Sequence, residues 1–81
     1  MPDPTVVIAE RGRYVWALGR FRAEVWRLSD SSRLWMYRVW DVLDHSLGGR
    51  GTIERGHAPK LATARTIVLA WLVQLNAGRS M

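Results

Sequence analysis

Two alternating runs of hydrophobic and polar residues mirror each other across the dipeptide Gly19-Arg20. Hydrophobic residues approach the dipeptide in steps of two and leave it in the same steps, which is the period of a β-strand. A two-residue loop with Gly in the first position suits the turn of a β-hairpin. The pattern therefore predicts two antiparallel strands whose apolar face pairs Leu18 with Phe21, Trp16 with Ala23 and Tyr14 with Val25.

The other face of this predicted hairpin mixes charge with aromatic and aliphatic groups. It carries Arg13, Val15, Ala17, Arg22, Glu24 and Trp26. A face that meets only water does not require a tryptophan among its charged residues. We therefore expect function to lie on this second face.

A strand rich in Val and Ile is predicted to precede the hairpin, over residues 5–10, with a tight turn at Arg11-Gly12. Pairing across that turn sets Glu10 beside Arg13, Ala9 beside Tyr14 and Val7 beside Trp16. Thr5, Val7 and Ala9 would then join the apolar face of the sheet.

A polar turn at Ser29-Asp30-Ser31-Ser32 leads to a fourth predicted strand over residues 33–42. Two registers fit this strand. A connection of two or four residues places Met36 and Trp40 on the Val25 side of the sheet. The opposite side then gathers Trp26, Trp35 and Tyr37.

A connection one residue longer or shorter exchanges the residues on the two faces of the fourth strand. Tyr37 and Val39 then enter the core, and two pairs form on the other side: Glu24 with Arg38 as a charge pair, and Arg22 with Trp40 as a cation–π pair. In either register the third and fourth strands carry apolar groups on both faces, so we expect something to cover each face.

The remaining chain predicts a loop, an edge strand and a helix. Gly48, Gly49 and Gly51 indicate a loop over 45–51, and an edge strand follows at 52–55. Pro59 suits the first turn of a helix that Gly78 would end. Its apolar stripe consists of Leu61, Ala64, Val68, Trp71, Leu72 and Leu75.

These elements predict an α+β fold: an antiparallel meander of four or five strands with one C-terminal helix packed on one face. Residues 5–78 form the expected single domain, between disordered tails at 1–4 and 79–81. Five tryptophans among 81 residues can overfill one side of such a sheet, so we expect a homodimer that buries the excess.

Charge and composition narrow the classes of function. Twelve basic against seven acidic residues give a net charge of +5, which suits a polyanionic partner. The absence of cysteine excludes disulfides and thiolate metal sites. The longest apolar run is too short to span a bilayer, so we expect no membrane role and a cytoplasmic location.

No catalytic, metal or cofactor site is expected. Asp41, Asp44 and His45 could form an acid–base group, but a polar turn that closes a strand predicts the same residues. His45 and His57 have no cysteine near them, so a zinc site would need carboxylates from distant segments. We therefore expect a non-enzymatic binding protein without a small-molecule substrate.

Several segments carry a resemblance to known proteins. The run Trp35-Met36-Tyr37-Arg38-Val39-Trp40, the glycine-bearing loop, and residues 56–65 that open the helix resemble small accessory proteins of actinobacterial phages. The order of three strands and a helix is similar to that of the arm-site DNA-binding domains of phage integrases. The resemblance implies a phage accessory protein that binds DNA or a host protein. An additional first strand and a second apolar face depart from the integrase pattern.

Two hypotheses follow from the basic and aromatic residues. In the first, the chain binds nucleic acid: Arg11, Arg13, Arg22, Arg27, Arg33, Arg50 and Arg55 contact phosphates, and Trp26, Trp35 and Tyr37 supply stacking surfaces. In the alternative, these rings lie in an interface, and the chain is a homodimeric protein–protein interaction module that binds and modulates a host protein. Trp, Tyr and Arg are enriched at both kinds of surface.

Overall fold

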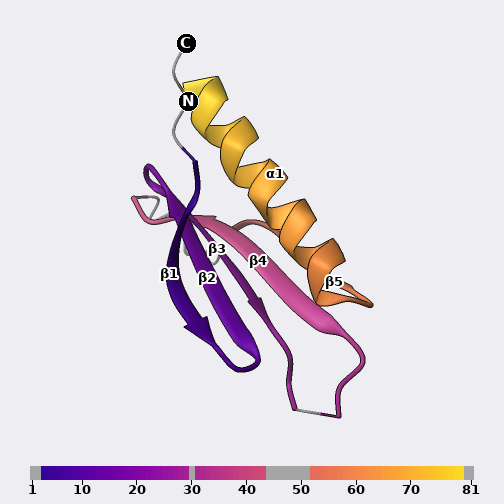
Figure 1. Cartoon of the computed structure of the whole chain (residues 1–81). Helices are drawn as coiled ribbons and strands as arrows, with labels where there is room; N and C mark the ends of the chain where they lie inside the picture. Colours follow the sequence, from indigo (N-terminus) through magenta and orange to yellow (C-terminus); the bar gives the residue numbers. More distant parts are fainter. Residues whose placement is uncertain (1–2, 30, 44–51, 80–81) are drawn as a thin grey trace.

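The computed structural model describes residues 3–29, 31–43 and 52–79. These residues form five strands and one helix: β1 (Thr5–Glu10), β2 (Arg13–Leu18), β3 (Phe21–Trp26), β4 (Trp35–Asp41), β5 (Thr52–Ala58) and α1 (Leu61–Arg79). Each strand pairs antiparallel with the next in one sheet of order β1-β2-β3-β4-β5 (Figure 1). The predicted α+β meander with one C-terminal helix is confirmed. The predicted loop over 45–51 lies outside the described residues.

The β2–β3 hairpin has the predicted register. Leu18 pairs with Phe21, Trp16 with Ala23 and Tyr14 with Val25. Gly19 adopts a φ of 61°, in the left-handed region that residues with a Cβ rarely enter. The glycine therefore suits the two-residue turn that sets the register of this hairpin.

The β1–β2 pairing departs from the prediction at Val7. Glu10 pairs with Arg13 and Ala9 with Tyr14 as expected, but Trp16 pairs with Val6, and the register shifts between Val6 and Ile8. This β-bulge inserts one additional residue into β1. The prediction that Thr5 and Val7 join the apolar face is therefore wrong; Val6 lines that face with Ala9, and Thr5 pairs with Ala17. The run Val6-Val7-Ile8 is apolar throughout, so its pattern does not mark the bulge.

The β3–β4 pairing adopts the second of the two predicted registers. Val25 pairs with Tyr37, Ala23 with Val39, Glu24 with Arg38, and Arg22 with Trp40. The first register, with Met36 and Trp40 on the Val25 side, is wrong. Residues 27–34 form a connection longer than a tight hairpin turn, so short-turn rules did not determine the register.

The boundaries of the last two elements also differ from the predictions. β5 extends to Ala58, three residues beyond the predicted edge strand. The backbone N–H of Ala64 donates to the carbonyl oxygen of Lys60 at 3.1 Å, so the helix begins after Pro59 rather than with Pro59 in its first turn. Gly78 lies inside α1, which ends at Arg79.

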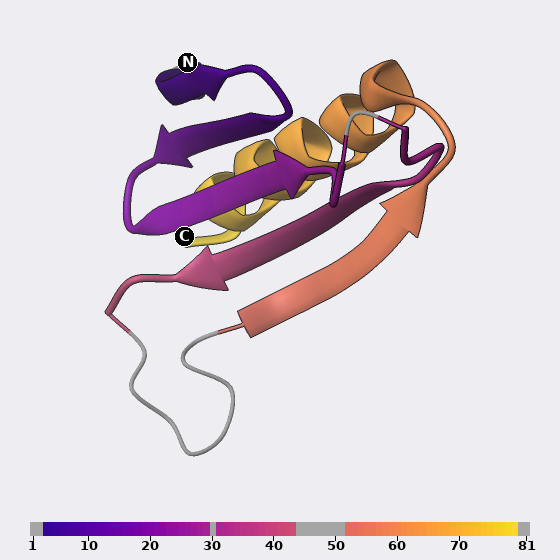
Figure 2. The ribbon, with the colours of Figure 1, turned by 90° about the horizontal axis from the view of Figure 1, so that it is seen from below.

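The core lies between α1 and the central strands. The largest fully buried side chains are Val25 and Val39 of the sheet and Val68 and Leu72 of the helix. Helix α1 contacts β2, β3, β4 and β5, most extensively β3 and β4, and within the described residues it does not contact β1. The helix forms a second layer on one side of the sheet (Figure 2). It is not apolar enough along its length to cross a membrane.

We predict that Gly19→Ala lowers the free energy of unfolding by about 1–2 kcal/mol, because a left-handed backbone conformation is unfavourable for alanine. The added Cβ would also lie 2.8 Å from the side-chain oxygen of Asn76. Gly78→Ala is the matched control. Its Cβ meets nothing within 4 Å in a helix, so it should leave stability unchanged or raise it by up to about 1 kcal/mol. Denaturant unfolding of both variants checks the pair, and equal destabilisation by the two would contradict it.

Candidate functional site

The sheet face turned away from α1, here called the outer face, carries most of the charged side chains of the strands. Side chains alternate between the two faces, and the strand residues of the core cluster, such as Trp16, Ala23 and Val39, lie on the α1 side. The outer face is therefore formed by Arg13, Val15 and Ala17 of β2, Arg22, Glu24 and Trp26 of β3, Met36, Arg38 and Trp40 of β4, and Arg55 and His57 of β5.

One carboxylate organises the centre of the outer face. The Nε of Arg13 donates to Oε2 of Glu24 at 2.6 Å, and Nη2 of Arg38 lies 3.8 Å from Oε1. The hydrogen bond to Glu24, followed by the charge of the carboxylate, raises the pKa of Arg13 above its ordinary value. The carboxylate neutralises one of two guanidinium charges, so this cluster keeps a net positive charge.

Arg38 lies beside an aromatic ring and opposite a second arginine. Its guanidinium lies 4.3 Å from the centroid of the Trp40 ring, so the cation–π partner of Trp40 is Arg38 and not the predicted Arg22. Across β4–β5, Arg38 pairs directly with Arg55. Like charges directly opposite each other destabilise a sheet, and a bound anion would relieve that repulsion.

A hollow of about 600 Å³ opens beside these two arginines. Its lining includes Trp26 and Met36 on one side and His57 on β5, in addition to Glu24, Arg38 and Arg55. Tyr37 and Gly56 complete the lining. A Cβ on Gly56 would lie 2.6 Å from the Tyr37 hydroxyl oxygen. The absence of a side chain at Gly56 therefore leaves room for the Tyr37 ring to pack against β5. The hollow therefore combines two guanidinium groups, an imidazole and an indole ring.

The predicted phosphate-contacting arginines occupy three different settings. Arg13 and Arg55 lie on the outer face. Arg22 lies there too, but its Nη1 donates to the carbonyl oxygens of Gly19 and Phe21, at 2.8 and 2.9 Å, which engages it in the hairpin turn. The others lie elsewhere: Arg11 and Arg33 are exposed in connections, Arg27 follows β3, and Arg50 is outside the described residues.

The predicted aromatic residues do not gather on one face. Trp35 and Tyr37 pack against the core on the α1 side, and the Trp35 ring lies 6.3 Å from Tyr14 and 5.0 Å from the Arg27 guanidinium. Of the three predicted aromatic residues, only Trp26 lies on the outer face. Their placement together belonged to the register that the structure excludes.

The predicted site residues omitted Arg38, Trp40 and His57. Alternation along β4 and β5 identifies them once the register of β4 is known, because they share a face with Trp26 and Arg55. The apolar groups of this face are partly covered within the single chain. Val15 is 6% exposed, and Trp26, Met36 and Trp40 are half-buried.

Asp41 has a structural partner. The Nε of Arg20 donates to Oδ1 of Asp41 at 2.8 Å, and Oδ1 also accepts the backbone N–H of Leu43 at 2.9 Å. The pair ties the β2–β3 turn to the end of β4. Asp44 and His45, its predicted companions in an acid–base group, lie outside the described residues. Within the part of the chain that the structure describes, no three His, Cys, Asp or Glu side chains are grouped to hold a metal ion.

Comparisons with protein-family models, with curated proteins and with solved structures find no match for this chain.

The two carboxylates should differ in their effect on stability. The Asp41 carboxylate is buried beside the partly exposed Arg20, so Asp41→Asn should lower the free energy of unfolding by about 2–3 kcal/mol. The Arg13 and Arg38 side chains that pair with Glu24 are 45% and 37% exposed, so water screens these ion pairs and Glu24→Gln should cost less than about 1 kcal/mol. Denaturant unfolding measures both changes, and a larger loss for Glu24→Gln would overturn the two assignments.

Proposed function

We propose that this chain is a nucleic-acid-binding protein and that the outer face of its sheet is the binding surface. The observation that carries the proposal is the cross-strand pair of Arg38 and Arg55 at the edge of a hollow that also contains Trp26. Two arginines on neighbouring strands that line one hollow can both contact phosphate oxygens, and an indole in the same lining gives a surface on which a base can stack.

The spread of charge across the sheet fits a polymer better than a single small anion. Arg13 lies on β2, Arg38 on β4 and Arg55 on β5. With neighbouring strands about 4.8 Å apart, these cations extend over about 14 Å. Several phosphates of one strand can therefore contact the face at once, which makes the affinity strongly dependent on salt.

The geometry favours single-stranded over duplex nucleic acid. The side chains of Trp26 and Trp40 are half-buried, so they do not reach far from the sheet into the groove of a duplex. Stacking on these rings requires bases that are not paired within a duplex. We expect the same face to bind a duplex less tightly, through its phosphates alone.

The direct test is the binding of a labelled single-stranded oligonucleotide, measured by fluorescence anisotropy at several salt concentrations. Contacts from three arginines to a single strand predict affinity about 20-fold weaker at about 200 mM than at about 50 mM salt. Removing one phosphate-contacting arginine should lower the salt slope by about one. Arg38→Gln and Arg55→Gln should each do so.

Arg65→Gln is the matched control, because it removes the same charge from an exposed position on α1. It should leave the salt slope unchanged. No binding at low salt would contradict the proposed function, and so would an equal effect of all three substitutions. Thermal unfolding of each variant confirms that the fold is intact.

A second prediction concerns the sign of the effect at Glu24. Its carboxylate competes with phosphate for Arg13 and Arg38, so Glu24→Gln should strengthen oligonucleotide binding although it removes ion pairs. The expected gain is about two- to fivefold, which corresponds to about 0.5–1 kcal/mol. Anisotropy titration at low salt measures it, and weaker binding by the variant would show that Glu24 supports the site instead of competing with it.

A further inference from the structure

Helix α1 is too narrow to cover the whole sheet. Five strands spaced about 4.8 Å apart place the outer two about 19 Å from each other. A helix with its side chains is only about 10–12 Å across. Because α1 contacts β2 to β5 but not β1 within the described residues, a strip of sheet about 7–9 Å wide remains beside it.

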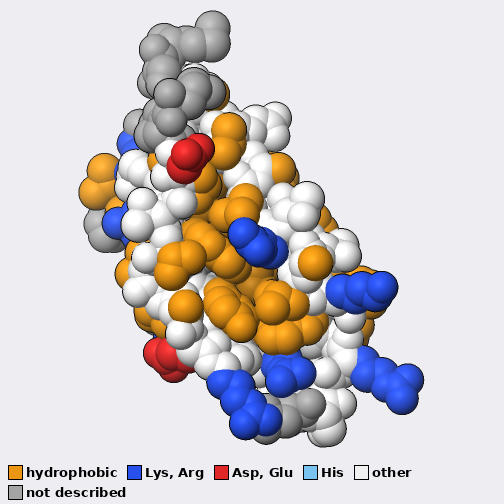
Figure 3. All heavy atoms as spheres, viewed as in Figure 1, with side chains coloured by type: hydrophobic (Ala, Val, Ile, Leu, Met, Phe, Trp, Pro, Cys, Tyr) orange, Lys and Arg blue, Asp and Glu red, His pale blue; other side chains and the backbone are white. Residues whose placement is uncertain are grey.

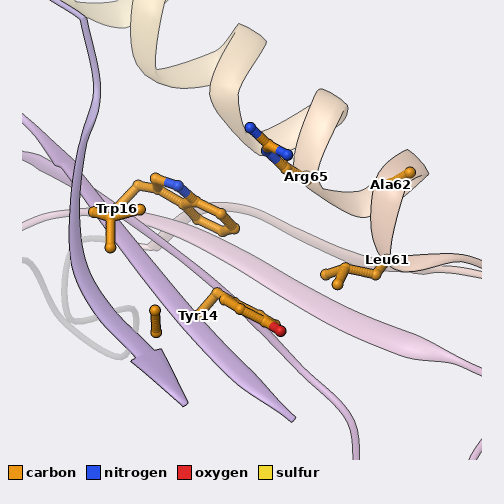
Figure 4. A pocket seen from close by; sticks show the side chains of 7 residues that line it. Tyr14, Trp16, Leu61, Ala62 and Arg65 are labelled. Atoms are coloured by element: carbon orange, nitrogen blue, oxygen red, sulfur yellow. The ribbon is translucent and has the colours of Figure 1, made fainter. Parts of the chain in front are cut away.

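This strip is a groove of about 620 Å³. Tyr14 and Trp16 of β2 face Leu61, Ala62 and Arg65 of α1 across it (Figure 4). Val6 and Ala9 of β1 complete the lining, and Val6 is 52% exposed. In the space-filling view, hydrophobic side chains gather between the first strands and α1, with Lys and Arg side chains beside them (Figure 3). The groove is therefore an apolar surface open to solvent.

The charge among the residues that line the groove is positive. Arg65 is the one charged residue among the seven that line it. The first turn of α1 contains no acidic residue, and Leu61 and Ala62 of that turn line the same groove. The N-terminal end of a helix carries partial positive charge, which adds to that of Arg65. An occupant with a carboxylate beside its apolar surface would complement this groove.

Two other occupants fit less well. The α1 helix of a second copy contains no acidic residue and would bring another Arg65 into the groove. A peptide strand added to the edge of β1 would meet the bulge at Val7, which interrupts regular pairing. A helix from a different protein meets neither obstacle.

We propose that the groove between β1 and α1 binds an amphipathic helix of a partner protein that carries an acidic residue beside its apolar stripe. The helix would lie next to α1 as the second helix of the layer and bury Val6, Tyr14 and Leu61. Its carboxylate would pair with Arg65. This mode of recognition places apolar residues at i, i+3, i+4 and i+7 into a groove. The surface lies on the opposite side of the sheet from the outer face, so the two sites can be tested separately.

The test uses two synthetic helical peptides with a leucine stripe of this spacing. They differ at one position beside the stripe, which is Glu in one peptide and Lys in the other. Amide chemical shifts of the isotope-labelled chain are followed during titration. The Glu peptide should shift the resonances of Val6, Tyr14, Leu61 and Arg65 and bind about fivefold more tightly than the Lys peptide.

Variants of the chain test whether the charge of Arg65 causes the preference for the Glu peptide. Arg65→Gln should abolish the preference for the Glu peptide, and Arg65→Glu should reverse it. Arg55→Glu, the same charge change on the outer face, should leave the preference intact. Any of four results would overturn the proposal: no saturable shifts with either peptide, shifts confined to the outer face, a preference that Arg65→Glu does not change, or concentration-dependent shifts of groove residues without peptide, which would assign the groove to a second copy of the chain.

Discussion

The packing of one helix against the middle of a five-stranded sheet is the interaction on which the rest of this structure depends. Val68 and Leu72 of α1 are fully buried with Val25 of β3 and Val39 of β4. This contact determines which face of each strand enters the core, and thereby which residues remain on the outer face. It also leaves β1 outside the contact of the helix, which creates the groove. Both candidate binding surfaces are consequences of where α1 lies.

Burial decides what each ion pair does in this basic chain. Arg20 and Asp41 form a pair whose carboxylate is buried, and that pair joins two parts of the fold. Glu24 instead lies between Arg13 and Arg38 on an open face, where a phosphate can compete with it. Ion pairs of the same type therefore join parts of the fold at one end of the sheet and lie within the proposed binding surface at its centre. Arg65 lies apart from both, on α1 beside the groove.

Local pattern was sufficient to predict the elements of the fold. The alternation around Gly19-Arg20 predicts the register of the β2–β3 hairpin, because a two-residue turn determines which residues of the two strands pair. The helix followed from its apolar period. The helix boundaries predicted from Pro59 and Gly78 were wrong. A proline can also lie just before a helix, and a glycine destabilises the last turn of a helix only slightly.

The parts of the site that sequence could not give depend on contacts between distant residues. The register of β4 follows a long connection, and a slip of one residue exchanges Trp35 and Tyr37 for Arg38 and Trp40 on the outer face. The bulge at Val7 lies in a uniformly apolar run and has no local signature. The groove depends on the width of the sheet relative to one helix, which no single segment encodes.

The most direct test of the central claim follows the five indole N–H resonances during titration with a single-stranded oligonucleotide. Trp26 and Trp40 lie on the outer face, whereas Trp16, Trp35 and Trp71 pack with the core on the helix side. The account predicts that the signals of Trp26 and Trp40 shift and that the other three remain in place. A response confined to Trp16, Trp35 or Trp71, or no response from any of the five, would contradict it.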